Sequence, residues 1–365
     1  MHPIRVGFFS PSLMLGGAER WIVSLATGLN PEYFDPLAIA IQEPNDVHPI
    51  VANRLENRVP ILHGPTHFAD LASRAEVIIA WGGCDISATA NYSCKIVYVS
   101  QGQCAWTHNV IRRALPYATH HVAVSKAASM AFPDRSKVKI IYNAVDESRC
   151  ECRTPREIQR RQWSVLPHEK LIGYVGRPSD EKNPLACVHA ARVMGPPYRP
   201  LLCGGGLYTD AYHSMARKIC ANVILLTEIN QVGDVYHALD CMMLASRVEG
   251  HSLALAEAWY CRCPTIATAV GATPELEARY GKLCASIPAA HTTRDLVTGV
   301  LAALSFDPPF LEHAHHVVAN TMCTQHMCRA WEAHLAAICR PNSPEARHLA
   351  ISDYVSNYQT PLPRS

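Results

Sequence analysis

The chain has 365 residues, more than the roughly 100 to 200 residues of a typical single domain, so its length predicts two domains. Hydrophobic residues make up 48% and charged residues 18%, a composition that is typical of globular proteins and excludes a disordered or fibrous chain. The formal net charge of +2 excludes the broad basic footprint of a nucleic-acid-binding protein, so we expect no nucleic-acid partner.

Short apolar runs recur along the chain, and each is followed by a glycine or polar turn and then by a helical pattern. Such runs are typical of buried parallel strands in βαβ units, and they predict one doubly wound sheet in each half of the chain. The predicted strands are residues 4–9, 37–41, 77–81, 96–99 and 121–124 in the first half, and 171–175, 200–203, 223–226, 241–245 and 265–267 in the second.

The polar stretch at residues 147–170 carries a run of arginines and predicts a connection with its own short helix. We place the domain boundary there, with an N-terminal domain at 1–150 and a C-terminal domain at 151–325. The stretch 315–338 has a helical apolar pattern, and the tail at 341–365, with four prolines, is predicted to be irregular.

The N-terminal sequence has no long apolar region followed by a small-residue cleavage site. We therefore expect the fifteen cysteines to be reduced and the protein to be cytoplasmic. The C-x-C pairs Cys150–Cys152 and Cys261–Cys263 lack the C-x2-C partner of a zinc site. No apolar run reaches the roughly 18 residues of a membrane-spanning helix. Peripheral contact with the inner face of a membrane stays open.

The segment at residues 246–257 follows a predicted strand and opens a helix. It holds Glu249 and Glu257, eight residues apart. If Glu249 lies in the turn and Glu257 in the helix, the two carboxylates can serve two ends of one long ligand. Backbone N–H groups of Gly250, His251 and Ser252 would then favour negative charge near the helix start. On its own, such a pair is also typical of a solvated helix face.

Two cations follow the strand at 171–175. Arg177 and Lys182 lie five residues apart in a loop that precedes the next helix. A planar guanidinium and a compact ammonium together suit the neutralisation of a diphosphate. A surface loop with incidental charges is the alternative interpretation.

Together, these motifs resemble family 4 of the retaining glycosyltransferases, which have the GT-B fold. Glu249, Gly250 and Glu257 match the family's E-G-F-G-x4-E motif. The other matching pieces occur in the family's order across almost the whole chain: Gly16-Gly-Ala-Glu-Arg20, Val122-Ala-Val-Ser125, Asn143-Ala-Val-Asp146, Gly176-Arg177 with Lys182-Asn-Pro184, and Gly271-Ala-Thr-Pro-Glu275.

The resemblance implies two Rossmann-like α/β domains that face a central cleft, with the chain after about residue 325 packing back on the first domain. It implies that Arg177 and Lys182 hold the donor diphosphate, and that Glu249 contacts the donor sugar. With these two cations, Glu249 forms the implied catalytic set. The implied donor-binding residues are Gly16, Gly17, Gln101, Gly250, His251, Ser252, Leu253 and Glu257, of which Glu257 takes the ribose hydroxyls.

The sequence departs from the family pattern at three positions. Gln101 stands where the family has a histidine, and an amide cannot act as a general base, although it can donate and accept hydrogen bonds. Ser252 and Ala272 replace glycines, so the donor preference can differ from that of the family. Other histidines that could substitute for the missing one are His108, His120 and His121.

The implied activity is a hexosyl transfer with retention from a UDP- or GDP-sugar to a hydroxyl acceptor. We expect no metal or other cofactor, because the sequence has no D-x-D triplet and offers a cationic clamp instead. The sequence leaves open the acceptor (a glycan, a lipid-linked or a small molecule) and the oligomeric state.

Three alternatives remain at this stage. A sugar-nucleotide epimerase of the same fold would use the same diphosphate site, and a non-catalytic sugar-nucleotide-binding protein would bind without transfer. A nicotinamide-dependent dehydrogenase is disfavoured, because Gly16-Gly-Ala-Glu19 and Cys203-Gly-Gly-Gly206 both fail the G-x-G-x-x-G spacing.

Overall fold

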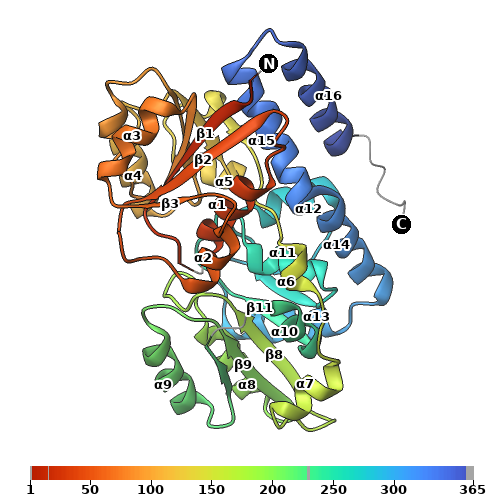
Figure 1. Ribbon diagram of the computed structural model, residues 1–365. Helices are drawn as coiled ribbons and strands as arrows, with labels where there is room; N and C mark the ends of the chain where they lie inside the picture. Colours follow the sequence, from red (N-terminus) through yellow and green to blue (C-terminus); the bar gives the residue numbers. More distant parts are fainter. Residues whose placement is uncertain (1, 15, 228–230, 359–365) are drawn as a thin grey trace. The chain divides into compact units, whose positions relative to one another are not determined.

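The computed structural model describes residues 2–14, 16–227 and 231–358, and it divides into two compact units (Figure 1). Unit 1 comprises Met1–Ala144 and Asn320–Ser365, and unit 2 comprises Val145–Ala319. The chain therefore leaves unit 1 at residue 144, six residues before the predicted boundary, and returns to it at residue 320 instead of 325.

Unit 1 is built on a seven-stranded sheet in which every neighbouring pair is parallel. The strand order is β3-β2-β1-β4-β5-β6-β7. The order reverses between β1 and β4, as in doubly wound folds. The strands are β1 (Ile4–Ser10), β2 (Phe34–Ile41), β3 (Ile61–His63), β4 (Val77–Trp81), β5 (Lys95–Ser100), β6 (His120–Ala123) and β7 (Val138–Ile140).

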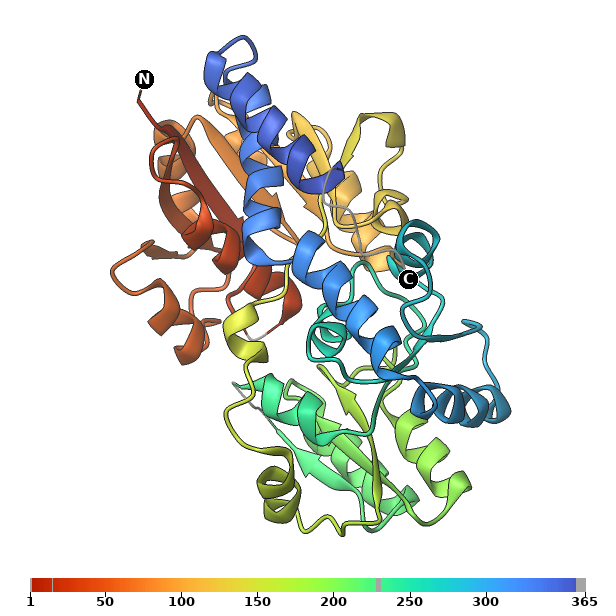
Figure 2. The same ribbon diagram turned by 90° about the vertical axis from the view of Figure 1, so that its right-hand side faces the viewer.

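The helices of unit 1 come from both ends of the chain. Figure 2 shows the last two, α15 and α16 in blue, beside the strands of this unit. Helix α15 packs on α1, and α16 packs on α15. The helices are α1 (Gly17–Gly28), α2 (Pro49–Leu55), α3 (Thr66–Arg74), α4 (Ala105–Ala114), α5 (Lys126–Ser129), α15 (Thr324–Cys339) and α16 (Pro344–Tyr358).

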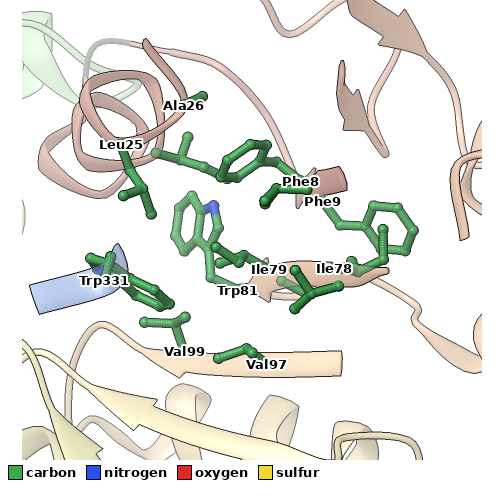
Figure 3. Packing of buried hydrophobic residues seen from close by; sticks show 14 of the residues in the cluster. Phe8, Phe9, Leu25, Ala26, Ile78, Ile79, Trp81, Val97, Val99 and Trp331 are labelled. Carbon is green, nitrogen blue, oxygen red and sulfur yellow. The ribbon is translucent and has the colours of Figure 1, made fainter. Parts of the chain in front are cut away.

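The C-terminal helix α15 completes the core of unit 1. Trp331 is buried, its ring lies 5.8 Å from that of Trp21 on α1, and Figure 3 shows it among residues of β4 and β5. The carboxylate of Glu332 accepts a hydrogen bond of 2.7 Å from the backbone N–H of Asn30. Segments separated by about 300 residues therefore share one hydrophobic core.

Unit 2 carries a six-stranded parallel sheet in the order β10-β9-β8-β11-β12-β13. Its strands are β8 (Lys170–Val175), β9 (Tyr198–Cys203), β10 (Ile224–Leu226), β11 (Cys241–Leu244), β12 (Thr265–Thr268) and β13 (Ala285–Ile287). Its helices are α6 (Glu147–Cys150), α7 (Arg156–Gln162), α8 (Leu185–Met194), α9 (Thr209–Ile219), α10 (Val232–Ala238), α11 (Leu253–Tyr260), α12 (Thr273–Tyr280), α13 (Thr293–Leu304) and α14 (Pro308–Thr321), the last of which runs into unit 1.

The ten predicted strands and the two doubly wound sheets are confirmed. The short helices α6 and α7 confirm the helical piece predicted for residues 147–170. The sequence missed β3, β7 and β13, which are three residues long and lie at sheet edges. Within its bounds each has at most two consecutive apolar residues, whereas the equally short β10 lies in the continuous apolar run 223–226 and was predicted.

One prediction about the C-terminal part was wrong. The stretch 315–338 is helical as predicted, but it is divided between two helices, because α14 ends at Thr321 and Cys323 adopts an extended conformation (φ −84°, ψ 164°) before α15. The tail is not irregular up to residue 358, because α16 spans Pro344–Tyr358. Proline suits the first turn of a helix, and the Ser343 hydroxyl accepts a hydrogen bond of 3.0 Å from the N–H of Ala346.

A histidine of α15 makes the stability of unit 1 sensitive to acid. Burial, together with nearby His120 and Lys139, lowers the pKa of His334 to about 4 from its ordinary 6.5. The unfolded chain thus binds a proton at a higher pH than the folded chain. The contribution of the neutral His334 to the unfolding free energy is therefore complete above pH 6.5 and is lost as the pH falls toward 4.

We expect His334→Gln to reduce the loss of unfolding free energy between pH 7.5 and pH 5.0 by about 2 kcal/mol relative to the wild type. Urea unfolding followed by tryptophan fluorescence measures it. The exposed His348→Gln is the matched control and should leave the pH dependence unchanged. Equal pH dependence in both variants would contradict the assignment.

Candidate functional site

The predicted motifs of unit 2 lie at the carboxyl ends of three neighbouring strands. Residues 176–184 follow β8, residues 245–252 follow β11, and residues 269–272 follow β12. Strand β9 pairs with one side of β8 and β11 with the other, so the strand order reverses between β8 and β11. Ligands of open α/β sheets bind at such a reversal, outside the carboxyl ends of the strands.

Lys182 and Glu249 meet at this edge. Lys182 Nζ lies 2.6 Å from Glu249 Oε2, and the Ser246 hydroxyl donates a hydrogen bond of 2.7 Å to Oε1. The Glu249 side chain is only 8% exposed and that of Lys182 is 23% exposed. Since a buried carboxylate requires compensating partners, these contacts hold the Glu249 carboxylate in one position.

Gly271 allows the loop after β12 to pack directly on Glu249. Its φ is +61°, and a Cβ at this position would lie 2.6 Å from the Cβ of Glu249 and 2.7 Å from the carbonyl oxygen of Gly250. The N–H of Ala272 donates a hydrogen bond of 2.8 Å to that same oxygen. Only glycine fits at residue 271, and the loop keeps Glu249 and Gly250 in place.

Glu257 lies in the second turn of α11, and its carboxylate is held at both oxygens. Arg149 NH1 lies 3.0 Å from Oε1, and the hydroxyl of Tyr236 donates a hydrogen bond of 3.1 Å to Oε2. The side chains of Arg149 and Glu257 are 7% and 6% exposed. Burial, with Glu257 nearby, raises the pKa of Tyr236, so its hydroxyl keeps the proton that it donates.

Arg177 presents its charge to solvent from a fixed backbone. Its side chain is 62% exposed, and NH2 lies 4.0 Å from Glu181 Oε1. The buried Tyr174 hydroxyl donates a hydrogen bond of 2.8 Å to the Arg177 carbonyl oxygen. A Cβ at Gly206 would lie 2.9 Å from Arg177 Cγ, so the glycine loop after β9 packs on the arginine stem. Arg177 and Lys182 thus belong to one loop, but they contact different carboxylates.

The residues between the two glutamates form the start of α11. Ser252 is the N-cap, and its hydroxyl accepts a hydrogen bond of 3.3 Å from the N–H of Leu255. Leu253 is the first helical residue. His251 is buried, and burial lowers its pKa to about 4, so the ring is neutral at pH 7 and adds no positive charge to the site.

The three predicted donor-binding residues of unit 1 lie at the carboxyl edge of its own sheet. Gly16 is the N-cap of α1 and Gly17 is its first residue. Gln101 follows β5, and its Oε1 accepts a hydrogen bond of 2.9 Å from Asn143 Nδ2. Among the described residues, Gln101 Nε2 and Asn143 Oδ1 have no partner. The amide pair therefore offers one donor and one acceptor, and this holds in either amide orientation.

The histidines proposed as substitutes for Gln101 occupy two elements of unit 1. His108 lies on α4. His120 and His121 lie on β6, where His120 meets the ring of His334 edge-on at 6.4 Å and His121 packs against Phe132 at 4.8 Å. Burial lowers the pKa of both residues, so both are neutral packing groups at pH 7.

Three residues that hold the predicted carboxylates were missed from the sequence. Ser246 lies three residues before Glu249, so its short spacing in the sequence could have marked it as a partner. Arg149 and Tyr236 lie 108 and 21 residues from Glu257, and nothing in the local pattern marks them. Their roles depend on the tertiary fold.

Within residues 2–14, 16–227 and 231–358, no group of three or more His, Cys, Asp or Glu side chains is arranged to hold a metal ion. The fifteen cysteines, all within these ranges, form no disulfide. No helix in these ranges combines the length and apolar character needed to cross a membrane.

Residues 155–306 match the family model described as glycosyl transferases group 1. This segment holds Arg177, Lys182, Glu249 and Glu257. A curated relative, a D-inositol 3-phosphate glycosyltransferase of Mycolicibacterium smegmatis, is 26% identical over 254 residues, which is 67% of this chain and 54% of the relative. The chain thus spans about half the length of that relative.

Solved structures show the fold. Anabaena Alr3699/HepE in complex with UDP-glucose has a TM-score of 0.78 at 17% identity, and the match covers 92% of this chain and 100% of that one. WaaG, a glycosyltransferase involved in lipopolysaccharide biosynthesis, has a TM-score of 0.70 at 14% identity, covering 92% and 99%. The two α/β units with parallel sheets have the GT-B fold.

The Lys182–Glu249 pair can be tested without a ligand. We expect Lys182→Met to lower the unfolding free energy by about 1.5 to 3 kcal/mol, because it leaves a buried carboxylate without its cation. The double variant Lys182→Met/Glu249→Gln should recover part of that loss. Urea unfolding at pH 7.5 measures both.

Lys170→Met is the matched control, since Lys170 is 51% exposed and lies 3.5 Å from Asp240. Because this lysine is exposed and Asp240 keeps its contacts with Arg156 and Arg160, the pair contributes at most about 1 kcal/mol. Equal losses for the two lysines, or additive losses in the double variant, would contradict the buried pairing.

Proposed function

We propose that this protein is a retaining glycosyltransferase that moves a hexose from a UDP- or GDP-sugar to a hydroxyl acceptor, without a metal ion. The observation that carries the proposal is the contact of 2.6 Å between Lys182 and Glu249 at the carboxyl edge of the unit 2 sheet, on the loop that also carries Arg177. This edge thus joins cations for a diphosphate with a fixed carboxylate for a sugar.

In this proposal, the diphosphate of the donor binds to Arg177 and Lys182. The Arg177 guanidinium is exposed on a fixed backbone and offers paired N–H donors. The Lys182 ammonium has three donors, of which one is used at Glu249. The two cations stabilise the negative charge that develops on the leaving nucleotide diphosphate.

Glu249 positions the donor sugar and Glu257 the ribose. The contacts of Glu249 with Lys182 and Ser246 use one lone pair of each oxygen. A carboxylate accepts about four hydrogen bonds, so it can still accept them from sugar hydroxyls. Their orientation by a fixed acceptor lowers the entropic part of the barrier.

The transfer proceeds on one face of the sugar. The bond between the anomeric carbon and the diphosphate oxygen breaks, and the acceptor oxygen bonds to the same face of that carbon. The acceptor's proton passes to the departing diphosphate oxygen. The side chains therefore orient the reactants and stabilise charge, and no protein nucleophile is required.

The similar proteins suggest which donor and acceptor to test first. UDP-glucose is the first donor to test, because it is bound in the Anabaena structure. Inositol 3-phosphate is an acceptor to include, because it appears in the name of the Mycolicibacterium relative. A thermal-shift screen of UDP- and GDP-sugars tests the proposal, since a bound donor raises the midpoint. Product analysis then separates transfer from epimerisation and from binding alone.

We expect Arg177→Ala to lower kcat at least 100-fold, because it removes a cation that stabilises the leaving diphosphate. The rate of sugar transfer, or of donor hydrolysis without acceptor, measures this effect. Arg217→Ala removes an exposed arginine from α9 and is the control for the loss of a surface charge. A near-normal rate for folded Arg177→Ala would refute the clamp.

We expect chelation by EDTA to change the rate of transfer by less than about twofold, because Arg177 and Lys182 supply the positive charge that a metal would otherwise provide. The rate is measured before and after dialysis against EDTA. A loss that Mg²⁺ or Mn²⁺ restores would mean that a metal takes part in catalysis.

A further inference from the structure

The contact between Arg149 and Glu257 is a buried ion pair within unit 2. Arg149 NH1 lies 3.0 Å from Oε1, both side chains are less than one-tenth exposed, and Tyr236 donates to the other carboxylate oxygen. A buried carboxylate with a donor at each oxygen cannot rotate without losing a hydrogen bond. The pair therefore fixes the orientation of the Glu257 carboxylate.

Arg149 is itself on a firmly attached segment. The Gln231 side chain donates hydrogen bonds of 2.9 and 2.7 Å to the carbonyl oxygens of Ser148 and Glu151. The Cys261 thiol, at the end of α11, donates to the carbonyl oxygen of Cys150 at 3.5 Å. Gln231 and Cys261 lie before and after Glu257 in the sequence, so helix α6 is hydrogen-bonded to both ends of the segment 231–261. These contacts hold Arg149 in place relative to Glu257.

We propose that Arg149 is a positioning residue for nucleotide recognition. It orients Glu257 to accept hydrogen bonds from the 2′- and 3′-hydroxyls of a ribose, and it thereby makes the site selective for ribonucleotides over 2′-deoxyribonucleotides. This inference rests on the proposed function, in which Glu257 binds the ribose. Arg149 acts through Glu257 and lies outside the segment that matches the family model.

The geometry suits a diol. Arg149 and Tyr236 fix both oxygens of the Glu257 carboxylate. The two oxygens of one fixed carboxylate match the spacing of two adjacent hydroxyls, each of which can donate to one oxygen. A 2′-deoxyribose supplies one hydroxyl fewer and leaves part of a charged acceptor desolvated, which discriminates strongly between otherwise similar ligands.

The test measures the affinities of UDP and 2′-deoxy-UDP, and of GDP and 2′-deoxy-GDP, by isothermal titration calorimetry. We expect the wild type to bind the ribonucleotide of its preferred base about 10- to 100-fold more tightly than the deoxy form, as one hydrogen bond to a charged acceptor implies. In Arg149→Met the ratio should fall below about threefold. Arg149→Lys should keep an intermediate ratio, since it restores the charge but not the geometry.

The matched control is Arg160→Met. Arg160 also forms an ion pair in unit 2, at 2.9 Å from Asp240 with both side chains 11% exposed, but Asp240 precedes β11 and lies at the amino end of the sheet. Arg160→Met should lower stability and leave the ribose-to-deoxyribose ratio unchanged. If Arg149 had only a structural role, Arg149→Met would likewise lower stability and leave this ratio unchanged.

If Arg149→Met does not fold, Tyr236→Phe is the variant to measure. It removes only the hydroxyl that donates to the same carboxylate, and it should also lower the ratio of ribonucleotide to deoxyribonucleotide affinity. An unchanged ratio in a folded Arg149→Met, or in Tyr236→Phe where the former is unfolded, overturns the inference. Wild-type protein that binds nucleotides without preferring ribose overturns the inference alone. Wild-type protein that binds no nucleotide overturns the proposed function as well.

Discussion

The candidate site depends on the cost of burying a carboxylate. Glu249 and Glu257 are both almost inaccessible to solvent, and such a group is stable only when cations and hydrogen-bond donors replace the lost water. Lys182 with Ser246 serves one, and Arg149 with Tyr236 serves the other. Because each carboxylate is held at both oxygens, the loop after β11 and the helix α11 present two fixed acceptors before any ligand arrives.

The parallel sheet brings the partners of these carboxylates together. Lys182 follows β8, Glu249 follows β11, and Gly271 follows β12, and these three strands are neighbours in the sheet. Residues almost 90 positions apart therefore converge at one edge. Arg149 enters from a different direction, on the short helix that opens unit 2.

Most of the fold was predictable from the sequence, because buried parallel strands are written as continuous apolar runs. Strands β4 (Val77–Trp81) and β8 (Lys170–Val175) are examples, since all of their residues except Lys170 are buried. Three of the edge strands, β3, β7 and β13, were not, since none of them contains more than two consecutive apolar residues. Helix α16 was missed because prolines suggested an irregular tail, whereas Pro344 occupies the first helical position, where its missing N–H has no cost.

The candidate site was only half predictable for a related reason. The spacing of Glu249 and Glu257, and of Arg177 and Lys182, is local and visible in the sequence. Which cation pairs with which carboxylate is a property of the tertiary structure: Lys182 contacts Glu249, while Arg177 lies near Glu181. Gln101 illustrates the same limit, since its hydrogen bond with Asn143 joins residues 42 positions apart.

The burial of Trp331 in the core of unit 1 has a consequence for biosynthesis. A ribosome releases the chain from its N-terminus, so all of residues 145–319 emerge before Trp331 and Glu332 do. Unit 2 can therefore complete its sheet before α15 is available to the first 144 residues. Unit 1, which contains the first residues to emerge, closes its hydrophobic core only after α15 has emerged as well.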